Sequence, residues 1–243
     1  ISMVVQNPDL KGLQLDNFEK SARQLNKITS ELQDMVMSIR MVPLSATFRQ
    51  MNRIVRDMCR KLGKEIKLEI IGEETEVDKN VIEHISDPLI HLVRNAIDHG
   101  IELPAEREAK GKQTNGTIML EAKNAGGDVL IIIKDDGKGL DRDNILHKAK
   151  VKGFFHQLHK DMTDREIYNL ILLPGFSTKE KVSEYSGRGV GMDVVKKNIE
   201  KIGGSVSVDS KPGQGTTVTL KIPLTLAIID GINIKVGKTC FTI

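Results

Sequence analysis

Glycines grouped between the regular segments of this chain limit its fold more than any other feature. The sequence contains 21 glycines, and three groups of them stand at residues 137–139, 187–191 and 213–215. Glycine has no Cβ, so such a group predicts a tight turn or a loop whose backbone approaches a neighbour or a ligand closely. We therefore expect three turns of this kind, and the segments around each one indicate its role.

The first group directly follows a predicted β-strand. Residues 128–134 are rich in Val, Leu and Ile, and the sequence continues as Asp135-Asp136-Gly137-Lys138-Gly139. The strand places Asp135 at its end, where a buried carboxylate can accept a hydrogen bond from the exocyclic amine of adenine. Taken alone, this pattern does not identify a nucleotide site, because calcium-binding loops and ordinary turns space Asp and Gly similarly.

A polar face marks the helix predicted from Asp78 to about His99. Asp is a preferred N-cap residue, and Pro88 inside the helix predicts a kink or a break. At helical spacing four polar residues share one face, namely His91, Asn95, Asp98 and His99. The opposite face is apolar and would pack on a sheet; it carries Leu89, Val93, Ala96 and Ile97. The alternative for this segment is a solvated surface with incidental histidines.

The other two glycine groups adjoin a predicted helix and a predicted hairpin. Gly187-Arg188-Gly189-Val190-Gly191-Met192 leads into a helix over 192–202, and exposed N–H groups at such a helix start form a site for an anion. The G-x-G-x-G spacing differs from the dinucleotide fingerprint. Gly213-Gln214-Gly215-Thr216 fits an ordinary hairpin turn, or a turn whose Thr216 hydroxyl holds a water between Asp135 and an adenine.

The order of the periodic segments predicts an α+β fold, a two-layer α/β sandwich with helices on one face of a mainly antiparallel sheet. We expect strands at 66–70, 117–123, 128–134, 205–210 and 216–222, and helices at 44–62, 78–99, 141–172 and 192–202. Asn124-Ala125-Gly126-Gly127 predicts a hairpin turn between two of these strands. Residues 174–191 lack periodicity, which predicts a mobile loop.

A long helix precedes this sandwich. Residues 13–42 carry an apolar seam at alternating spacings of three and four, which is typical of a coiled coil or a helical bundle. The seam consists of Leu15, Phe18, Ala22, Leu25, Thr29, Leu32, Val36 and Ile39, and Pro43 ends the helix. The next helix carries Arg49, Arg53, Arg56 and Arg60 on its outer face. We interpret that face as solvated and not as a binding surface.

Composition argues against several classes of protein. The sequence has 36 Lys and Arg against 33 Asp and Glu, a net charge of +3, which gives no electrostatic case for nucleic acid or an anionic membrane. No apolar run approaches the roughly 20 residues that cross a bilayer, and the N-terminus lacks the layout of a signal peptide. The only cysteines, Cys59 and Cys240, lie far apart, which predicts no disulfide framework and suits a reducing cytoplasm.

Taken in order, the motifs are a helix with an asparagine, a strand followed by D-x-G-x-G, a loop, a G-x-G-x-G helix start and a G-x-G-T hairpin. This set resembles the GHKL superfamily of ATP-binding domains, which includes histidine kinases, gyrase B-type topoisomerases and MutL. Within it, the chain is most similar to the CheA family of chemotaxis histidine kinases. The matching segments are residues 40–43, 55–57, 88–102, 174–178, 186–193 and 223–228. The resemblance covers nearly everything after residue 25.

The resemblance implies three regions and an activity. Residues 1–43 would be part of a helical dimerisation domain, residues 44–225 an ATP-binding histidine kinase catalytic domain, and residues 226–243 the start of a truncated CheW-like regulatory domain. The enzyme would bind ATP and Mg²⁺ and transfer the γ-phosphoryl group to a histidine on a separate phosphotransfer domain, in two-component chemotaxis signalling. None of the six histidines in this sequence is expected to be the phosphoacceptor.

The resemblance also implies roles for individual residues. Asn95 would bind Mg²⁺ through its side-chain oxygen, Asp135 would select adenine, and His91 and Arg94 would act at the transferred phosphate. Gyrase-like relatives carry a water-activating glutamate at the position of His91, so an imidazole there favours transfer over hydrolysis. The other expected nucleotide contacts are Asp98, His99, Gly137, Gly139, Lys148, Ser177, Thr178, Gly187, Arg188, Gly189, Val190, Gly191, Met192 and Thr216. Residues 174–191 would form a lid over the nucleotide.

The implied partners are those of a signalling kinase. They are a second copy of the chain, bound through the N-terminal helix in the full-length protein, receptors and a CheW-like adaptor bound through the regulatory domain, and a downstream response regulator. The location would be cytoplasmic, at receptor arrays, with no nucleic acid bound and no insertion into a membrane. Two other classes stay open: a nucleotide-gated clamp of the mismatch-repair or topoisomerase type, and a non-catalytic scaffold with a degenerate nucleotide fold.

Overall fold

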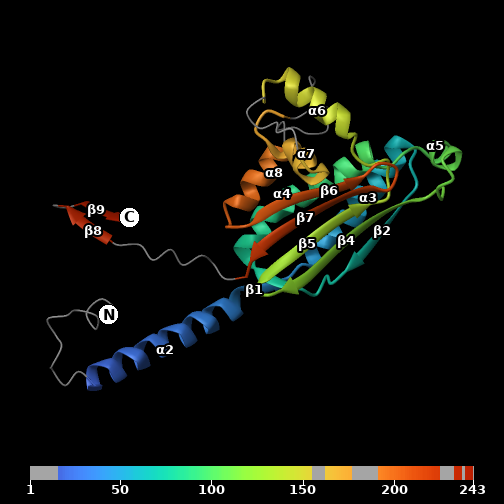
Figure 1. The fold of residues 1–243 in the computed structure, drawn as a ribbon. Helices are drawn as coiled ribbons and strands as arrows, with labels where there is room; N and C mark the ends of the chain where they lie inside the picture. The colour runs from blue at the N-terminus through green and yellow to red at the C-terminus, as the bar shows by residue number, and fades with distance from the viewer. Residues whose placement is uncertain (1–15, 155–161, 177–190, 225–232, 237–238, 243) are drawn as a thin grey trace. The chain divides into compact units, whose positions relative to one another are not determined.

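The computed structural model describes residues 16–154, 162–176, 191–224, 233–236 and 239–242. The chain divides into two compact units, Ile1–Val42 and Pro43–Ile243. The first unit contains the long helix α2 (Asp16–Arg40), and the short strand β1 (Met41–Pro43) spans the boundary between the units (Figure 1).

Helix α2 confirms the helix predicted over 13–42 in its described part. Three apolar residues of the predicted seam, Leu25, Leu32 and Ile39, have 52%, 54% and 84% of their surface exposed. Ile28 and Met35 are exposed as well. An exposed apolar stripe along a helix marks a surface that another helix can cover.

A five-stranded sheet forms one layer of the second unit, in the order β2-β4-β5-β7-β6 (Figure 1). The strands are β2 (Ile66–Ile71), β4 (Gly116–Ala125), β5 (Asp128–Asp135), β6 (Ser205–Lys211) and β7 (Gly215–Pro223). β2 runs parallel to β4, and the other three pairings are antiparallel. The register puts Asp135 opposite Ile118, so the end of the central strand β5 lies at the end of the sheet where β4 begins.

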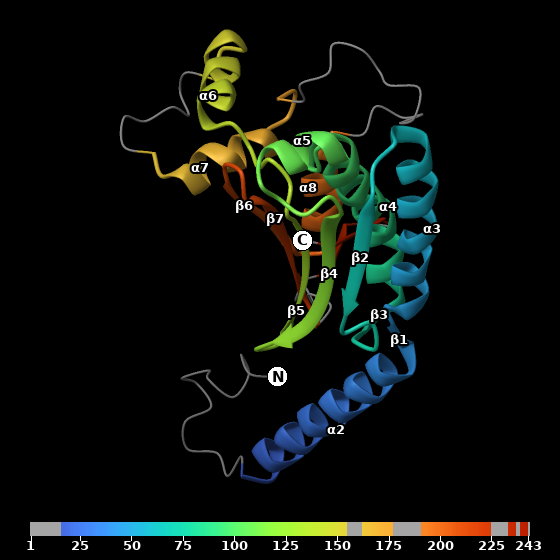
Figure 2. The same ribbon diagram turned by 90° about the vertical axis from the view of Figure 1, so that its right-hand side faces the viewer.

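Helices α3 (Ser45–Leu62), α4 (Lys79–Asn95) and α8 (Met192–Glu200) form a second layer on one face of this sheet (Figure 1) (Figure 2). Alternate strand residues point into the space between the layers, as the period of two requires. The buried core contains Ile118, Leu120, Ile131, Ile133, Val218 and Leu220 from the strands and Phe48, Met51, Ile85, Leu89, Val93, Val195 and Ile199 from the helices. The predicted sandwich is therefore confirmed.

The ends of the first two helices of this layer follow from their sequences. Helix α3 ends at Gly63, which has a φ of 63° and donates its N–H to the Cys59 carbonyl. Helix α4 begins after Asp78, whose side chain accepts a hydrogen bond from the Asn80 N–H at 2.7 Å. Pro88 lies inside α4 without breaking it. Because Pro88 is buried, tertiary packing holds the helix together where one backbone hydrogen bond is missing.

The prediction of a regular α-helix as far as His99 is wrong beyond Asn95. There α4 changes into a π-helix, η2 (Ala96–Gly100), and the Ile101 N–H donates to the Ala96 carbonyl at 2.8 Å. The wider π-turn shifts Asp98 and His99 away from the positions that α-helical spacing assigns them relative to His91.

The helix predicted over 141–172 is also corrected. The structure has α6 (Arg142–Val151), α7 (Asp164–Asn169) and a short 3₁₀-helix, η4 (Leu170–Leu172). Gly153 ends the first of these with a φ of 78°. A capping box at Thr163 and Glu166 begins the second, because the two residues satisfy each other's backbone N–H groups.

Four shorter elements complete the described chain. β3 (Glu76–Asp78) leads into α4, and α5 (Pro104–Ala109) lies between η2 and β4. β8 (Asn233–Val236) and β9 (Thr239–Thr242) form an antiparallel hairpin. The assignment of residues 226–243 to a regulatory domain stays a prediction.

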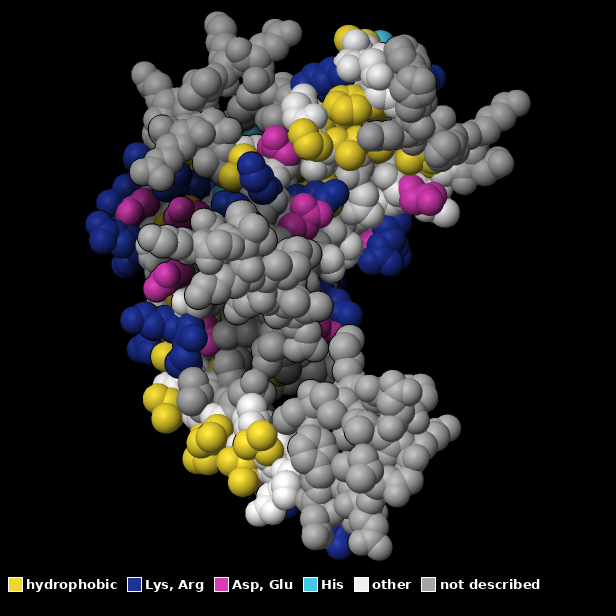
Figure 3. All heavy atoms as spheres, turned by 90° about the vertical axis from the view of Figure 1, so that its left-hand side faces the viewer, with side chains coloured by type: hydrophobic (Ala, Val, Ile, Leu, Met, Phe, Trp, Pro, Cys, Tyr) yellow, Lys and Arg dark blue, Asp and Glu magenta, His cyan; other side chains and the backbone are white. Residues whose placement is uncertain are grey.

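Two surface properties bear on function. On the face drawn in Figure 3, Lys and Arg side chains are interspersed with Asp and Glu, which agrees with the small net charge. Over the described residues, none of the helices combines the length and the apolar character that crossing a bilayer requires.

Candidate functional site

Asp135 is the last residue of β5, the central strand of the sheet, and its carboxylate lies against the turn that follows. The Oδ1 atom accepts hydrogen bonds from the N–H of Gly137 at 2.9 Å and from the N–H of Thr216 at 3.3 Å. Only 6% of the residue's surface is exposed. Within the described part of the chain no hydrogen bond reaches Oδ2, and this oxygen is not sealed from solvent. It therefore keeps its capacity to accept a hydrogen bond.

Glycine residues from three segments of the chain lie around this carboxylate. A Cβ on Gly215, whose φ is 108°, would overlap the Asp135 carbonyl, and a Cβ on Gly137 would overlap the Gly100 carbonyl. A Cβ on Gly100 would lie 3.1 Å from Oδ1 of Asp135. The close approach of three segments to Asp135 therefore depends on glycine at these positions.

Burial raises the pKa of Asp135 from 3.8 to about 6. The N–H donors of Gly137 and Thr216 oppose this rise, as does the nearby charge of Lys112, while Asp136 adds to it. The carboxylate is therefore ionised at neutral pH in a poorly solvated position. Such a group is stabilised by any donor that approaches its open oxygen.

The turn after Asp135 packs on the β6–β7 hairpin. The Gly213 N–H donates to the Lys138 carbonyl at 2.8 Å, and the Leu140 N–H donates to Oγ of Ser210 at 2.8 Å. Oγ of Ser210 also lies 3.2 Å from Oγ1 of Thr216. The first and last glycine groups of the sequence thus pack against each other. The hypothesis that the Thr216 hydroxyl holds a water between Asp135 and an adenine requires this arrangement.

Asn95 is the last residue of α4, at the change from α-helix to π-helix. Such a π-turn often marks a functional site. The Nδ2 atom of Asn95 lies 3.6 Å from Sδ of Met192, the first residue of α8. This contact uses one N–H of the amide, and among the described residues no hydrogen bond reaches its side-chain oxygen. It also brings the start of α8 beside Asn95.

Lys64 holds the end of the π-helix and was not predicted. Its Nζ donates to the carbonyls of Ile97 at 2.6 Å, Asp98 at 3.0 Å and Ile101 at 2.7 Å. Burial lowers the pKa of Lys64, and the charge of Asp98 opposes this. A cation at the carbonyl end of a helix stabilises it, so Lys64 fixes the segment that follows Asn95. No local sequence pattern indicates this role, because the contact joins distant segments.

The other residues predicted on the asparagine helix remain close to Asn95. His91 and Arg94 are half-buried on α4. Asp98 and His99 lie on η2 and form an exposed pair, with 3.2 Å between Oδ2 and Nε2.

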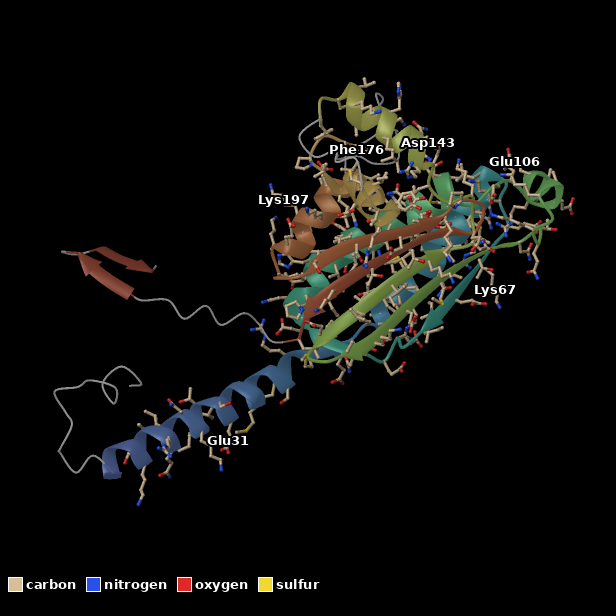
Figure 4. The ribbon with its side chains drawn as sticks, in the orientation of Figure 1. Glu31, Lys67, Glu106, Asp143, Phe176 and Lys197 are labelled. Carbon is tan, nitrogen blue, oxygen red and sulfur yellow. The ribbon has the colours of Figure 1, made fainter. Side chains whose placement is uncertain are left out.

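The remaining predicted residues divide into those that the structure describes and those that it does not. Gly139 follows the Asp135 turn, Lys148 lies on α6, and Gly191 is the buried N-cap of α8. Phe176, labelled in Figure 4, is buried and packs its ring on Phe154 with 5.9 Å between centroids. Six predicted residues lie outside the described residues: Ser177, Thr178, Gly187, Arg188, Gly189 and Val190.

Charged side chains also gather beneath the Asp135 turn, and the sequence analysis missed them. This ion cluster consists of Glu102, Arg107, Lys110, Lys112 and Asp136. Glu102 and Arg107 each have side chains that are 2% exposed, with 3.3 Å between Oε2 and NH1. Charged residues around a short helix are usually solvated, so nothing in the sequence pattern revealed their burial.

A comparison with protein families identifies the family of the domain that contains these residues. The family described as "Histidine kinase-, DNA gyrase B-, and HSP90-like ATPase" matches residues 84–226, more than half of the chain. The chain belongs to this family. The matched region contains Asn95, Asp135 and Thr216, so the open carboxylate oxygen lies within the ATPase domain. The predicted resemblance to ATP-binding domains is confirmed.

Curated relatives narrow the similarity within this ATPase family. The chemotaxis protein CheA of Salmonella typhimurium is 49% identical over 221 residues, which cover 91% of this chain and 33% of that protein. CheA of Bacillus subtilis is 44% identical over 234 residues, which cover 96% of this chain and 35% of that protein. The predicted similarity to CheA histidine kinases is confirmed, and the chain spans about a third of the length of these relatives. Among solved structures, the catalytic domain of histidine kinase ThkA matches 76% of this chain and 95% of that chain, at 20% identity and a TM-score of 0.48.

Proposed function

We propose that this chain is the ATP-binding catalytic core of a histidine protein kinase, which transfers the γ-phosphoryl group of ATP to a histidine on a separate phosphotransfer domain. The main observation in support is that the Oδ2 atom of the buried Asp135 accepts no hydrogen bond from the described residues. The exocyclic amine of adenine would supply the donor that this oxygen lacks, whereas guanine would turn a carbonyl oxygen toward it. The chain's membership of the ATPase family supports this assignment.

Asn95 would hold Mg²⁺ beside the phosphates. Mg²⁺ prefers oxygen ligands and usually takes few from protein, keeping water and phosphate oxygens. The side-chain oxygen of Asn95 suits this role, because its amide nitrogen faces Met192. Among the described residues there is no group of three or more His, Cys, Asp or Glu that could enclose a metal ion, so phosphate and water would complete the shell.

The start of α8 would receive the phosphates. The first N–H groups of a helix have no partner within it and carry partial positive charge, which favours an anion. Gly191 is the N-cap of this helix, and Met192, its first residue, contacts Asn95, so a phosphate there would lie near the Mg²⁺ site. Six further residues stay predicted phosphate or nucleotide contacts: Ser177, Thr178, and the four that precede this helix start, Gly187, Arg188, Gly189 and Val190. Residues 174–191 stay the predicted lid.

His91 would act on the transferred phosphate. It precedes Asn95 by one helical turn, so the two side chains project from the same side of α4. A neutral imidazole there can orient the incoming histidine, and it activates water less well than a carboxylate does. Arg94, His99 and Lys148 would contact phosphate oxygens, and Asp98 would orient His99 through their pairing.

Partners and domains follow from the same assignment. Residues 1–43 would help to dimerise the full-length protein, residues 44–225 would form the kinase domain, and residues 226–243 would begin a CheW-like regulatory domain. That domain would connect the kinase to receptors and to a CheW-like adaptor, and a response regulator would receive the phosphoryl group. The protein would act in the cytoplasm, at receptor arrays.

Incubation with labelled ATP, Mg²⁺ and a separately produced phosphotransfer domain tests the proposal. We expect acid-labile phosphate on the added domain and none on the chain itself. Asp135→Asn serves as the variant that should not bind ATP. ATP hydrolysis without a labelled domain would favour a clamp-type ATPase, and an absence of ATP binding would leave only the scaffold alternative.

A further inference from the structure

The segment between η2 and β4 supplies charged side chains to the turn after Asp135. Figure 2 shows α5 of this segment at the end of the sheet where β4 begins. None of the three residues that matter, Glu102, Arg107 and Lys112, lies in a glycine motif. Their contacts nevertheless determine the conformation of the turn.

Arg107 fixes the side chain of Asp136. Its NH1 and NH2 atoms lie 3.2 Å from Oδ1 and 2.9 Å from Oδ2 of that carboxylate, and Oδ1 also accepts the Thr117 N–H at 2.9 Å. Nε of Arg107 donates to the Gln113 carbonyl at 2.7 Å. A bidentate pair of this kind has a defined geometry, so the Asp136 side chain is held toward Arg107.

Lys112 fixes the backbone of the same turn. Its Nζ donates to the carbonyl of Asp136 at 2.9 Å and to the carbonyl of Gly137 at 2.6 Å. The same atom lies 3.1 Å from Oε1 of Glu102. One ammonium group therefore contacts two successive carbonyls and a buried carboxylate.

A planar trans peptide turns its C=O and N–H in opposite directions. With the Asp136 carbonyl directed at Lys112, the Gly137 N–H of that peptide is directed at Oδ1 of Asp135. With the Gly137 carbonyl directed at Lys112, the Lys138 N–H is directed at the Gly100 carbonyl, 3.0 Å away. Lys112 thus contributes the shorter bond that orients the first peptide, whose carbonyl also lies 3.3 Å from NH1 of Arg107, and it orients the second peptide through the Gly137 carbonyl.

We propose that Lys112 is a positioning residue for recognition of the nucleotide base. It holds the Asp136–Gly137 peptide so that the Gly137 N–H occupies Oδ1 of Asp135 and Oδ2 is presented to the exocyclic amine of adenine. Glu102 and Arg107 hold Lys112 and Asp136 in place. This inference rests on the proposed function, and it assigns base selectivity to a residue outside the glycine motifs.

The charges of the ion cluster explain why Lys112 keeps this position. Burial raises the pKa of Glu102, but hydrogen bonds from its own N–H and from Lys112 and Lys110 outweigh burial and bring the pKa below its usual value. Glu102 is therefore an anion that holds the ammonium of Lys112 against the turn. Removal of that ammonium would leave the Gly137 carbonyl without a donor and the Asp136 carbonyl with only the longer contact of 3.3 Å from NH1 of Arg107, which would loosen the orientation of the Asp136–Gly137 peptide.

Lys112→Met tests the inference against a matched control, Lys110→Met. Lys110 also contacts Glu102, at 3.3 Å, but its side chain is 53% exposed and no bond from it to the turn is found among the described residues. Affinities for ATP and for inosine triphosphate, which has an oxygen in place of the amine, are measured by calorimetry. We expect Lys112→Met to weaken ATP binding on the order of tenfold and inosine triphosphate binding much less, whereas Lys110→Met keeps the wild-type ratio.

Equal weakening for both nucleotides in Lys112→Met, or no weakening, would overturn the inference, because general damage to the fold does not distinguish the two bases. Failure of the proposed function has a different signature: the wild-type chain would not prefer ATP, or Asp135→Asn would bind ATP normally. If Lys112→Met does not fold, as judged by circular dichroism, Lys112→Gln is compared with Lys110→Gln, and the same ratio of affinities decides.

Discussion

Asp135→Asn should make the unliganded chain more stable while it abolishes tight ATP binding. Burial raises the pKa of Asp135 from 3.8 to about 6. A rise of roughly two units corresponds to about 3 kcal/mol by which folding disfavours the ionised carboxylate. Because asparagine is neutral, the variant avoids this cost. We expect its free energy of unfolding at pH 8 to rise by about 1 to 3 kcal/mol.

The size of this effect depends on pH. The folded-state pKa of Asp135 lies above the unfolded-state value, so the wild-type chain gains stability from this group as the pH falls through 6, and the gain is complete below pH 3.8. The advantage of Asp135→Asn should therefore be full at pH 8, fall to about half near pH 5, and vanish at still lower pH.

The loss of ATP binding has a geometric cause. The N–H groups of Gly137 and Thr216 both donate to Oδ1, so the oxygen of an asparagine would keep that position. Its amide nitrogen would then replace Oδ2 and present N–H groups to the adenine amine, which is also a donor. Two facing donors repel each other, and the base loses its partner.

Two assays check the prediction together. Thermal unfolding at pH 8, pH 6 and pH 5 compares stability, where 1 kcal/mol shifts the midpoint by roughly 2–4 °C for a domain of this size. Calorimetric titration with a non-hydrolysable ATP analogue measures binding. A variant that is less stable than wild type at pH 8, or whose stability difference does not change with pH, would show that Asp135 is a structural residue and not a strained ligand-binding one.

Three further predictions address other parts of the chain. His91→Gln should retain ATP binding and lose most phosphoryl transfer to an added phosphotransfer domain; equal losses in titration and transfer would make His91 structural. Gly137→Ala should destabilise the fold by about 1–3 kcal/mol in denaturant unfolding, since its Cβ would overlap the Gly100 carbonyl, whereas Gly126→Ala meets nothing within 4 Å and should cost only backbone strain. Leu25→Lys with Leu32→Lys should reduce self-association of the exposed seam in sedimentation over a concentration series, and a parent chain that is monomeric at every concentration would contradict this.

Periodicity and turn chemistry were sufficient to predict most of the fold. The strands alternate buried and partly exposed residues along β4 and β5, and this alternation is visible in the sequence as the positions of Ile and Leu. The turn at Gly126–Gly127 and the cap at Asp78 were predicted from residue types alone, and both are confirmed. The site was predicted in part, because the glycine groups around Asp135 and Thr216 do meet.

The missed features depend on contacts between distant segments. The π-turn after Asn95 follows from no local propensity; Lys64, far earlier in the chain, holds its carbonyl end. Pro88 would end an isolated helix, and only its buried surroundings allow α4 to continue. Burial of Arg107 is set by Glu102, Asp136 and the Gln113 carbonyl together, and a sequence window cannot show that such groups converge.

The glycines of the Asp135 turn and Lys112 solve one physical problem between them. A turn that passes against the Gly100 carbonyl requires glycine at position 137, and glycine adds backbone freedom that must be lost on folding. A free turn would present the Gly137 N–H to Asp135 only part of the time. Lys112 offsets that freedom, since it holds the carbonyls on both sides of the glycine Cα atom. Close approach and a fixed orientation at the proposed base-binding carboxylate therefore come from different parts of the sequence, and the glycine motif without Lys112 would give the turn its shape without holding it in one orientation.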